Sequence, residues 1–480
     1  MRFGILFVIP LFLACAQKNV NPTPSLQSTV LESANTINPL IQGVWKSIGN
    51  GYYLEARKEG ISLYSYTKSF CYKEKNDYLE SLLNSQSQFL LRADTLGIYL
   101  TDFGDKTQVL QTKKDFIKVD GLPAHTIGFS KVTELSPKKS FELYLETMRE
   151  NYAFSAERNL NWEELYNRYK DSASSGKEAL YNTMGKIATL TKDQHTKVIS
   201  ETGKSLQYRI TPSAEIVKAT FKEQSEVKNL GKYFDMFFDT NYRNISDSLL
   251  QGKGQKIAND KIEWGSLHEN IGYIHIHSFA GFLGKDFSRK QQIDSLNLQM
   301  QSIIETFQNK DAIIIDVSFN FGGYDATALT IASYFTDAPV LSHTSQVYND
   351  GEFYDEDTVV IYPADSITFT KPVYVLMTDI SRSAAEGFAM MMGSLPNVKL
   401  VGTSTLGTLS GMLGKSIGDF YTTYSNQRLV NTDGKFYEVS GVEPDIALTV
   451  FKKENIFHSH KNTVWDLLNI IEELITSDHN

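Results

Sequence analysis

Residues 311–323, DAIIIDVSFNFGG, join a short apolar run to a glycine turn. The run 312–315 is rich in β-branched side chains, has the length of a strand and is bounded by polar residues. Asn320 and the pair Gly322-Gly323 then permit a tight turn whose backbone amides face outward, an arrangement that binds anions. The stretch predicts a buried strand that ends in an anion-binding turn.

Further segments of the same kind lie on both sides of this stretch. Apolar runs of strand length alternate with helical stretches, and this alternation is typical of an α/β core in which helices cover a largely parallel sheet. The strands are expected at 271–276, 312–315, 373–377 and 398–401, and the helices near 289–308, 325–335 and 383–394. We assign residues 263–455 to this core and residues 461–478 to a C-terminal amphipathic helix.

Two regions of different pattern precede the core. Residues 39–133 contain short alternating runs separated by Gly, Asn and Asp, which predicts a small all-β module, either a sandwich or a barrel. Its expected role is that of a spacer or of a ligand-recognition module. Residues 136–262 begin with Ser136-Pro137, a typical helix start, and continue with helical apolar stripes. We expect a helical region there.

The N-terminus predicts export and a lipid anchor. Residues 3–14 form an apolar run that is too short to span a membrane and has the length of a secretory signal. The run ends in Leu13-Ala14-Cys15, which resembles a bacterial lipobox, so residues 1–14 would be removed and Cys15 acylated. Residues 16–38 complete a flexible tether, 15–38, and localisation to the bacterial cell envelope, on the periplasmic side or the cell surface, follows. The alternative is a plain signal peptide.

Composition excludes several classes of function. The 480 residues carry a net charge of −9 without a long basic cluster, which disfavours nucleic acid as a partner. The two cysteines provide no disulfide framework. Phosphate-binding and dinucleotide-binding glycine motifs are absent from the sequence, so no cofactor is expected. The spaced pairs His275/His277 and His458/His460 lack further metal ligands nearby in sequence, and no metal site is expected.

Three loops carry residues suited to acyl transfer. Ser381 and Ser383 follow the strand 373–377 at the start of a helix, where free amides favour a developing oxyanion. His195, just beyond a helix that ends near residue 190, has the side chain best suited to accept a serine proton. Glu438 lies in a polar loop and is suited to orient an imidazole. Each residue alone is also compatible with a purely structural role, as a helix cap, a solvated loop residue or a turn residue.

Taken in order, these loops resemble one known family, the S41 serine peptidases, which include the tail-specific or carboxyl-terminal processing peptidases. The likeness covers roughly residues 140–450. It rests on five ordered elements: D-x-H-T (Asp193, His195, Thr196), D-h-x-x-N-x-G-G (Asp316, Asn320, Gly322, Gly323), S-A-x-E (Ser383, Ala384, Glu386), V-G-x-x-T-x-G (Val401, Gly402, Thr405, Gly407) and Y-E-x-x-G-V-x-P-D (437–445).

The resemblance implies a fold and a mechanism. It implies a crotonase-like core, a ββα spiral, and a serine peptidase that acts on peptides or proteins. The lysine that many members place after T-x-G is Thr408 here, so the Ser/Lys dyad is not expected, and the more distant Lys415 is its only substitute. The sequence is more similar to the tricorn-like branch, which implies Ser383 as nucleophile, His195 as base and Glu438 as the orienting acid. The oxyanion hole would comprise the amides of Gly322, Gly323 and Ala384.

Some features depart from the family pattern and leave alternatives open. The arginine and the proline or glycine common before the Gly pair are Ser318 and Phe321, and residues 201–262 are too few for a PDZ module. A noncatalytic ligand- or peptide-binding lipoprotein on the same scaffold is therefore a second hypothesis. A structural envelope protein whose β module performs the function is a third. The sequence specifies neither the substrate nor the oligomeric state.

Overall fold

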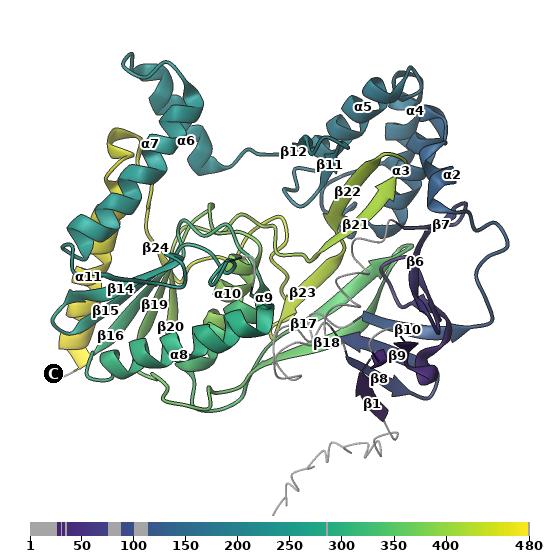
Figure 1. Cartoon of the computed structure of the whole chain (residues 1–480). Helices are drawn as coiled ribbons and strands as arrows, with labels where there is room; N and C mark the ends of the chain where they lie inside the picture. Colours follow the sequence, from purple (N-terminus) through teal and green to yellow (C-terminus); the bar gives the residue numbers. More distant parts are fainter. Residues whose placement is uncertain are drawn as a thin grey trace, which may run out of the picture.

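The computed structural model describes residues 26–29, 31–33, 36–74, 88–99, 114–284 and 287–478. These residues form a mixed α/β protein with two lobes that are joined by long β hairpins (Figure 1). The predicted signal peptide and Cys15 lie outside the described residues. No helix in the described ranges has both the length and the apolar character needed to cross a bilayer.

The core sheet is the one predicted from the alternating pattern. Its strands lie in the order β13 (Gln255–Ile257), β14 (Ile262–His268), β15 (Ile271–Ile276), β16 (Ala312–Asp316), β19 (Val373–Met377), β20 (Val398–Gly402) and β24 (Ile446–Ala447). From β15 to β24 all neighbours are parallel, whereas β13 and β14 add an antiparallel edge. The side chains of β15, β16 and β19 are buried along their whole length, as both faces of the sheet are covered.

Helices cover both faces of this sheet. Helices α8 (Arg289–Phe307), α9 (Asp325–Ala332) and α10 (Ala384–Gly393), with the 3₁₀ turn η6 (Ser333–Phe335), pack on one face. On the other face lie α6 (Pro212–Glu223), α7 (Leu230–Arg243), the π-helical turn η5 (Asn244–Leu249), the 3₁₀ turn η7 (Lys453–Asn455) and α11 (Ser459–Asp478). The predicted core helices and the C-terminal helix are thus confirmed within a few residues.

The second lobe contains three helices stacked on a hairpin of the core. They are α3 (Pro137–Asn151), α4 (Trp162–Ala173) and α5 (Lys177–Leu190), preceded by the short α2 (Phe129–Thr133). Ser136 caps α3 and Asn161 caps α4, as their sequence positions predict. The hairpin of β21 (Met412–Ile417) and β22 (Phe420–Ser425) buries Leu413, Phe420 and Tyr424 among these helices. A segment more than 200 residues further along the chain therefore completes this small core.

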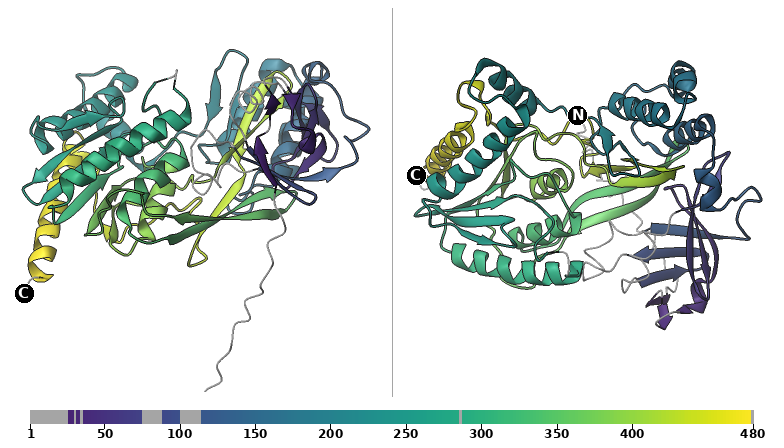
Figure 2. Two further views of the ribbon diagram at one scale, coloured as in Figure 1. Left: turned by 60° about the horizontal axis from the view of Figure 1, so that its bottom comes forward. Right: turned by 45° about the horizontal axis from the view of Figure 1, so that its top comes forward.

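The prediction that residues 136–262 form one helical region is wrong. After α5 the chain forms β11 (Lys197–Ile199) and β12 (Ser205–Gln207), and β11 pairs with β22. It then crosses to the other lobe, where α6 and α7 pack against α11 and the sheet (Figure 2). Helical periodicity marks which face of a helix is buried but not which partner buries it, so the pattern did not reveal the crossing.

The N-terminal module is a single antiparallel sheet in the part of the chain described. Its strand order is β1 (Leu26–Thr29), β8 (Gln88–Arg92), β9 (Thr95–Tyr99), β10 (Lys114–Val119), β4 (Gly43–Ser47), β5 (Tyr52–Arg57), β6 (Gly60–Tyr66) and β7 (Cys71–Lys73). Trp45, Leu54 and Phe89 fill its core. Cys71 is buried and forms no disulfide.

Part of the predicted tether 15–38 belongs to this module. Strand β1 pairs with β8, and β2 (Leu31–Ser33) forms a small hairpin with β3 (Thr36–Ile37), which the 3₁₀ turn η1 (Pro39–Ile41) follows. The polar composition of the segment predicted flexibility. The segment is instead ordered at its C-terminal end, because Ile37 is fully buried and packs against the sheet.

A second hairpin system links the lobes. Strand β17 (Val340–Asn349) pairs with β18 (Glu352–Ile361) and with β23 (Gln427–Asn431), and all three run between the core and the second lobe. Strand β22 leads directly into β23, and the segment 403–411 joins β20 of the core sheet to β21 of the second lobe. The candidate site is built on that segment.

Candidate active site

Ser383 lies at the turn between β19 and α10 in a strained conformation. Its backbone angles are φ 58° and ψ −127°, a region that non-glycine residues rarely adopt. Its N–H donates to the Thr408 carbonyl at 3.1 Å and to the Glu386 carboxylate at 3.1 Å. A serine held in a sharp strand-to-helix turn presents its hydroxyl away from the sheet, as a nucleophile requires.

The neighbouring Ser381 has a structural role. It is fully buried, and its hydroxyl donates to the Val317 carbonyl at 2.7 Å while accepting the Thr378 N–H at 3.0 Å. Ser383 is half-buried and stands at the N-cap position of α10, so its side chain is not enclosed in the core as that of Ser381 is. Of the two serines that the sequence left open, Ser383 is therefore the one available for chemistry.

Glu386 supports the turn from within α10. Its carboxylate accepts from the Thr405 hydroxyl at 2.7 Å and from the N–H groups of Gly407 and Thr408 at 2.6 and 2.8 Å. Burial raises the pKa of Glu386 to about 7, although these donors act in the opposite direction. The glutamate of the S-A-x-E element thus connects the Ser383 turn to the segment 405–408.

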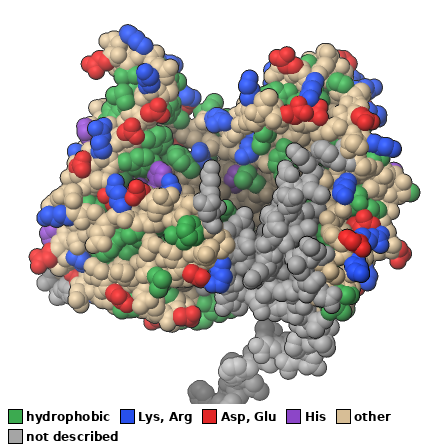
Figure 3. Space-filling view, viewed as in Figure 1, with side chains coloured by type: hydrophobic (Ala, Val, Ile, Leu, Met, Phe, Trp, Pro, Cys, Tyr) green, Lys and Arg blue, Asp and Glu red, His purple; other side chains and the backbone are tan. Residues whose placement is uncertain are grey.

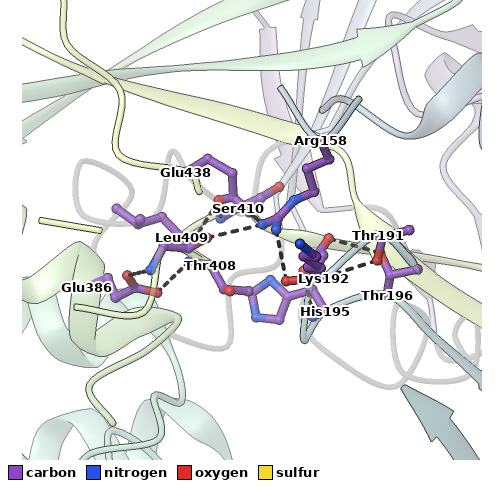
Figure 4. A network of polar contacts seen from close by, with 12 residues as sticks. Arg158, Thr191, Lys192, His195, Thr196, Glu386, Thr408, Leu409, Ser410 and Glu438 are labelled. Atoms are coloured by element: carbon purple, nitrogen blue, oxygen red, sulfur yellow. Dashed lines mark hydrogen bonds and ion pairs between the residues drawn. The ribbon is translucent and has the colours of Figure 1, made fainter. Parts of the chain in front are cut away.

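His195 approaches the site from the second lobe. It follows a turn in which Asp193 accepts the His195 N–H at 2.8 Å and the Thr196 hydroxyl at 2.9 Å. Its backbone carbonyl accepts from the Thr423 hydroxyl of β22 at 2.7 Å. The ring lies beside Thr408, and its Nδ1 has no hydrogen-bond partner among the described residues (Figure 4). The docked hairpin therefore determines where this imidazole is placed.

The surroundings of His195 favour its neutral form. Burial lowers the pKa of the imidazole to about 4, and the charges of Lys197 and Arg382 lower it further, whereas Asp193 and the Ser410 backbone raise it. The ring is consequently neutral at pH 7. A neutral imidazole is the form that accepts a proton from serine.

Glu438 binds the loop beside the imidazole. Its Oε2 accepts the N–H groups of Leu409 at 2.8 Å and Ser410 at 3.0 Å, and its Oε1 lies 3.4 Å from Arg158 Nη2 (Figure 4). Burial first, and then repulsion from Asp193, raises the pKa of Glu438 well above its ordinary value, while Arg158 opposes the shift. The carboxylate thus positions the neighbours of His195 and forms no hydrogen bond with the ring itself.

Arg158 belongs to the site but carries no signal in the sequence. It follows α3, and its buried guanidinium donates to the Lys192 carbonyl at 2.9 Å, to the Gly407 carbonyl at 3.3 Å and to Glu438. These contacts join the helical lobe, the 407–410 segment and the Glu438 loop. An arginine in a loop between helices is usually solvated, so only the tertiary contacts identify it.

The predicted oxyanion turn lies against Ser383. A Cβ placed on Gly322, whose φ is +97°, would lie 2.8 Å from both the Ser383 Cβ and the Arg382 carbonyl oxygen. Only glycine fits this approach. The Gly322 N–H donates to Asn320 Oδ1 at 2.7 Å, which removes it from the candidate oxyanion donors and corrects that part of the prediction. The amides of Gly323 and Ala384 have no acceptor within the described ranges.

The two substitutions in this turn have partners of their own. The Ser318 hydroxyl donates to the buried Asp316 carboxylate at 2.5 Å, and Phe321 lies 4.4 Å beneath the Arg382 guanidinium. Asp316 also contacts His460 Nε2 at 2.8 Å and, more distantly, His275 Nδ1 at 3.6 Å. The turn is thus anchored without the arginine that is common in the family.

The histidine pairs form no metal site in the part of the chain that the structure describes. No group of three or more His, Cys, Asp or Glu side chains there is arranged to hold a metal ion. His460 pairs with Asp316, and His458 Nδ1 lies 3.2 Å from the Asn244 amide.

Lys415 lies away from the nucleophile. It is fully buried at the junction with the N-terminal module, where its Nζ donates to the Gly51 carbonyl at 2.6 Å and to the Tyr66 carbonyl at 3.4 Å. Thr408, at the position of the family lysine, donates its N–H to Glu386. The Ser/Lys alternative has no support in this geometry.

Comparison with known proteins agrees with the motif analysis. Residues 270–448 match the model of peptidase family S41. The carboxy-terminal processing protease CtpA of Bacillus subtilis is 28% identical over 178 residues, which are 37% of this chain. The chain spans about a third of that relative, 34% of its length.

Solved structures share the fold over a larger part of the chain. A candidate peptidase from Parabacteroides merdae superposes with a TM-score of 0.56 at 22% identity, over 70% of this chain and 96% of that one. Mature CPAF superposes with a TM-score of 0.52 at 13% identity, over 73% of this chain and 99% of that one. The common fold therefore includes segments outside the matched domain. The solved structures share the fold, and the match of residues 270–448 assigns this part of the chain to the model of peptidase family S41.

Proposed function

We propose that this protein is an exported, lipid-anchored serine peptidase that hydrolyses peptide bonds through an acyl-enzyme. The observation that carries the proposal is the convergence of three distant residues on the segment 407–410. Ser383 donates its N–H to Thr408, Glu438 accepts from Leu409 and Ser410, and the His195 ring lies beside Thr408. An alcohol, an imidazole and an acid are the three kinds of side chain that serine hydrolases use.

The mechanism follows from these positions. The Ser383 hydroxyl attacks the peptide carbonyl while neutral His195 takes its proton and then returns it to the leaving amine. Water, activated by the same imidazole, hydrolyses the ester. Glu438 and Arg158 act as positioning residues, since they hold the loop against which the imidazole rests.

The amides of Gly323 and Ala384 are the proposed oxyanion donors. Both are free of intramolecular acceptors in the described part of the chain, and Ala384 is the first residue of α10. A helix N-terminus adds a favourable partial positive charge. Loss of one such donor typically costs about 2.7–4 kcal/mol of transition-state stabilisation.

Two finer features also belong to the proposal. The core, residues 263–455, is proposed to be a crotonase-like ββα spiral, which the alternation of β15, α8, β16, α9, β19 and α10 supports. Acylation of Cys15 and display on the periplasmic side or the cell surface are proposed from the apolar run 3–14 and the Leu13-Ala14-Cys15 sequence. Mass spectrometry of the mature N-terminus tests the anchor: an unmodified chain that begins elsewhere refutes it.

A noncatalytic binding protein on the same scaffold is the second hypothesis. Its sequence basis was the altered Gly-Gly turn. The turn nevertheless packs against Ser383 through Gly322 and has its own anchor in Asp316. We therefore favour the catalytic hypothesis.

Labelling with a fluorophosphonate tests the catalytic hypothesis directly. The native chain should be labelled on Ser383, and Ser383→Ala should abolish labelling because it removes the proposed nucleophile. Ser394→Ala is the matched control, since this residue caps the other end of α10 and its hydroxyl bonds only the Met391 carbonyl. A native chain that stays unlabelled and cleaves no peptide would favour the binding protein.

A further inference from the structure

Three basic side chains surround the proposed site. Lys197 starts β11 two residues after His195, and Arg382 immediately precedes Ser383. Gln207 of β12 is the register partner of Lys197, and Arg209 Nη2 donates to Gln207 Oε1 at 3.4 Å. In the described ranges, none of the three cations forms an ion pair with an acidic side chain. The face in Figure 3 is hollowed between the lobes, and Lys, Arg and His side chains lie around the hollow.

The three charges are close enough to influence one another. Burial lowers the pKa of Lys197 and Arg209 lowers it further, while burial and Arg209 lower the pKa of Arg382 and Glu386 raises it. The nearby acids are engaged elsewhere: Asp193 accepts from its own turn, and Glu386 accepts from the 405–408 segment. Like charges repel, so gathering them costs free energy unless an anion completes the cluster. This cationic group stands out in a chain whose net charge is −9.

An unpaired buried donor lies within this cluster. Gln194 is only 9% exposed, and its Oε1 accepts from Arg382 Nη1 at 2.6 Å. Its Nε2 has no acceptor within the described part of the chain. Leaving a buried donor unpaired typically costs about 1–3 kcal/mol. An oxygen ligand placed against Arg382 would satisfy it.

The position of Arg382 is fixed on both sides. Its guanidinium lies over the Phe321 ring at 4.4 Å and is bonded to Gln194 at its edge. Planar guanidinium groups bind carboxylates through two parallel hydrogen bonds, and prior fixation reduces the entropy lost on binding. The aromatic residue that departs from the family pattern thus serves as a platform for this arginine.

We propose that Arg382 and the Gln194 amide, together with Lys197 and Arg209, form a subsite for a carboxylate of the substrate. The carboxylate belongs either to an Asp or Glu side chain or to the C-terminus of the peptide. An extended peptide advances about 3.4 Å per residue, so a group beside Ser383 selects a carboxylate within about two residues of the scissile bond. This subsite rests on the proposed peptidase function and specifies its substrate class.

Matched peptides test the subsite. Four peptides share one cleavable sequence. They carry Asp or Asn next to the scissile bond, each with a C-terminal acid or amide. The native enzyme should cleave a carboxylate peptide about 10-fold to 100-fold faster in kcat/KM than its amide counterpart, the range expected for a charged hydrogen bond. The pair that shows the preference identifies the source of the carboxylate, and the preference should shrink as salt is added.

Substitutions test whether the preference for carboxylate peptides depends on Arg382, Lys197 and Arg209. Arg382→Gln should bring the acid-to-amide ratio close to one, Arg382→Lys should restore part of it, and Lys197→Gln and Arg209→Gln should reduce it less. Lys399→Gln is the control, since it removes an exposed cation of β20 and should leave the ratio unchanged. A ratio within one sample does not depend on the fraction of the protein that is folded.

Two results would overturn the subsite. One is a native enzyme that cleaves all four peptides at equal rates, and the other is a ratio that survives Arg382→Gln. Binding of the same peptides to Ser383→Ala, measured by calorimetry, separates this inference from the catalytic one. A protein that cleaves nothing but binds carboxylate peptides more tightly through Arg382 would retain the subsite and lose the peptidase.

Discussion

The surroundings of Lys415 and of His195 differ in how completely their buried polar atoms are paired. Lys415 Nζ donates to two carbonyls and lies 4.8 Å from the Tyr52 ring. The neighbouring Glu74 accepts from the Ser416 N–H and the Ser65 hydroxyl. Around His195, by contrast, the ring Nδ1, Gln194 Nε2 and Arg158 Nε have no partners among the described residues. The hydrogen bonds of Lys415 join two parts of the fold, whereas unpaired buried donors cost free energy that a bound ligand offsets.

Removing the imidazole should produce the largest effect. His195→Ala is expected to lower kcat by about 10⁶-fold, as loss of the base does in serine hydrolases, with little change in stability. Hydrolysis of a peptide that the native protein cleaves provides the measurement. His458→Ala makes the same change at an exposed histidine and should remain active. An active His195→Ala variant would show that this imidazole is not the base.

Removing the Lys415 side chain should reduce stability and leave the chemistry intact, the reverse of what is expected for His195. Lys415→Met is expected to lower the free energy of unfolding by about 1–3 kcal/mol, because it leaves the buried Gly51 and Tyr66 carbonyls without their donor and removes a charge near Glu74. Urea denaturation measures this loss, while fluorophosphonate labelling of the folded variant should persist. The double variant with Glu74→Gln should lose less than the sum of the two single changes. Unchanged stability with lost labelling would instead make Lys415 part of the chemistry.

The pH profile should show the smallest effect, and it tests whether His195 is as buried as its contacts indicate. Burial lowers the pKa of His195 from 6.5 to about 4, so the acid limb of kcat/KM should fall near pH 4. Between pH 6.5 and pH 4, His195 is protonated in the unfolded chain but neutral in the folded protein. Protonation therefore favours the unfolded chain, and the contribution of His195 lowers the free energy of unfolding progressively as the pH falls from 6.5 to 4.

Variants of the charged residues near His195 test whether the acid limb of the pH profile reports the pKa of this imidazole. Lys197→Gln should move the acid limb upward by removing a cation, and Asp193→Asn should move it downward by removing the opposing charge. Lys399→Gln, which removes an exposed cation of β20, should leave the limb in place. A limb near pH 6.5 in the native enzyme would mean that the imidazole is solvated like an ordinary surface histidine.

The local elements of the core could be predicted because their patterns are local. The run 312–315 became β16 and the apolar run 373–377 became β19, since a buried parallel strand needs uniformly apolar side chains. Ser136 and Asn161 marked true helix starts, because a cap depends on a hydrogen bond that spans only three residues.

The order of residues along the chain is enough to predict which side chains are available for chemistry, the order of the strands and helices that carry them, and their likeness to the S41 family. Four further features became visible only in the folded molecule: Arg158 joins the lobes, Gly322 donates to Asn320, α6 and α7 cross to the core, and Lys415 is a structural contact. Each of these depends on where a group finds its partner. A sequence pattern indicates whether a side chain will be buried or hydrogen-bonded. Which distant residue becomes its partner depends on how the whole molecule packs.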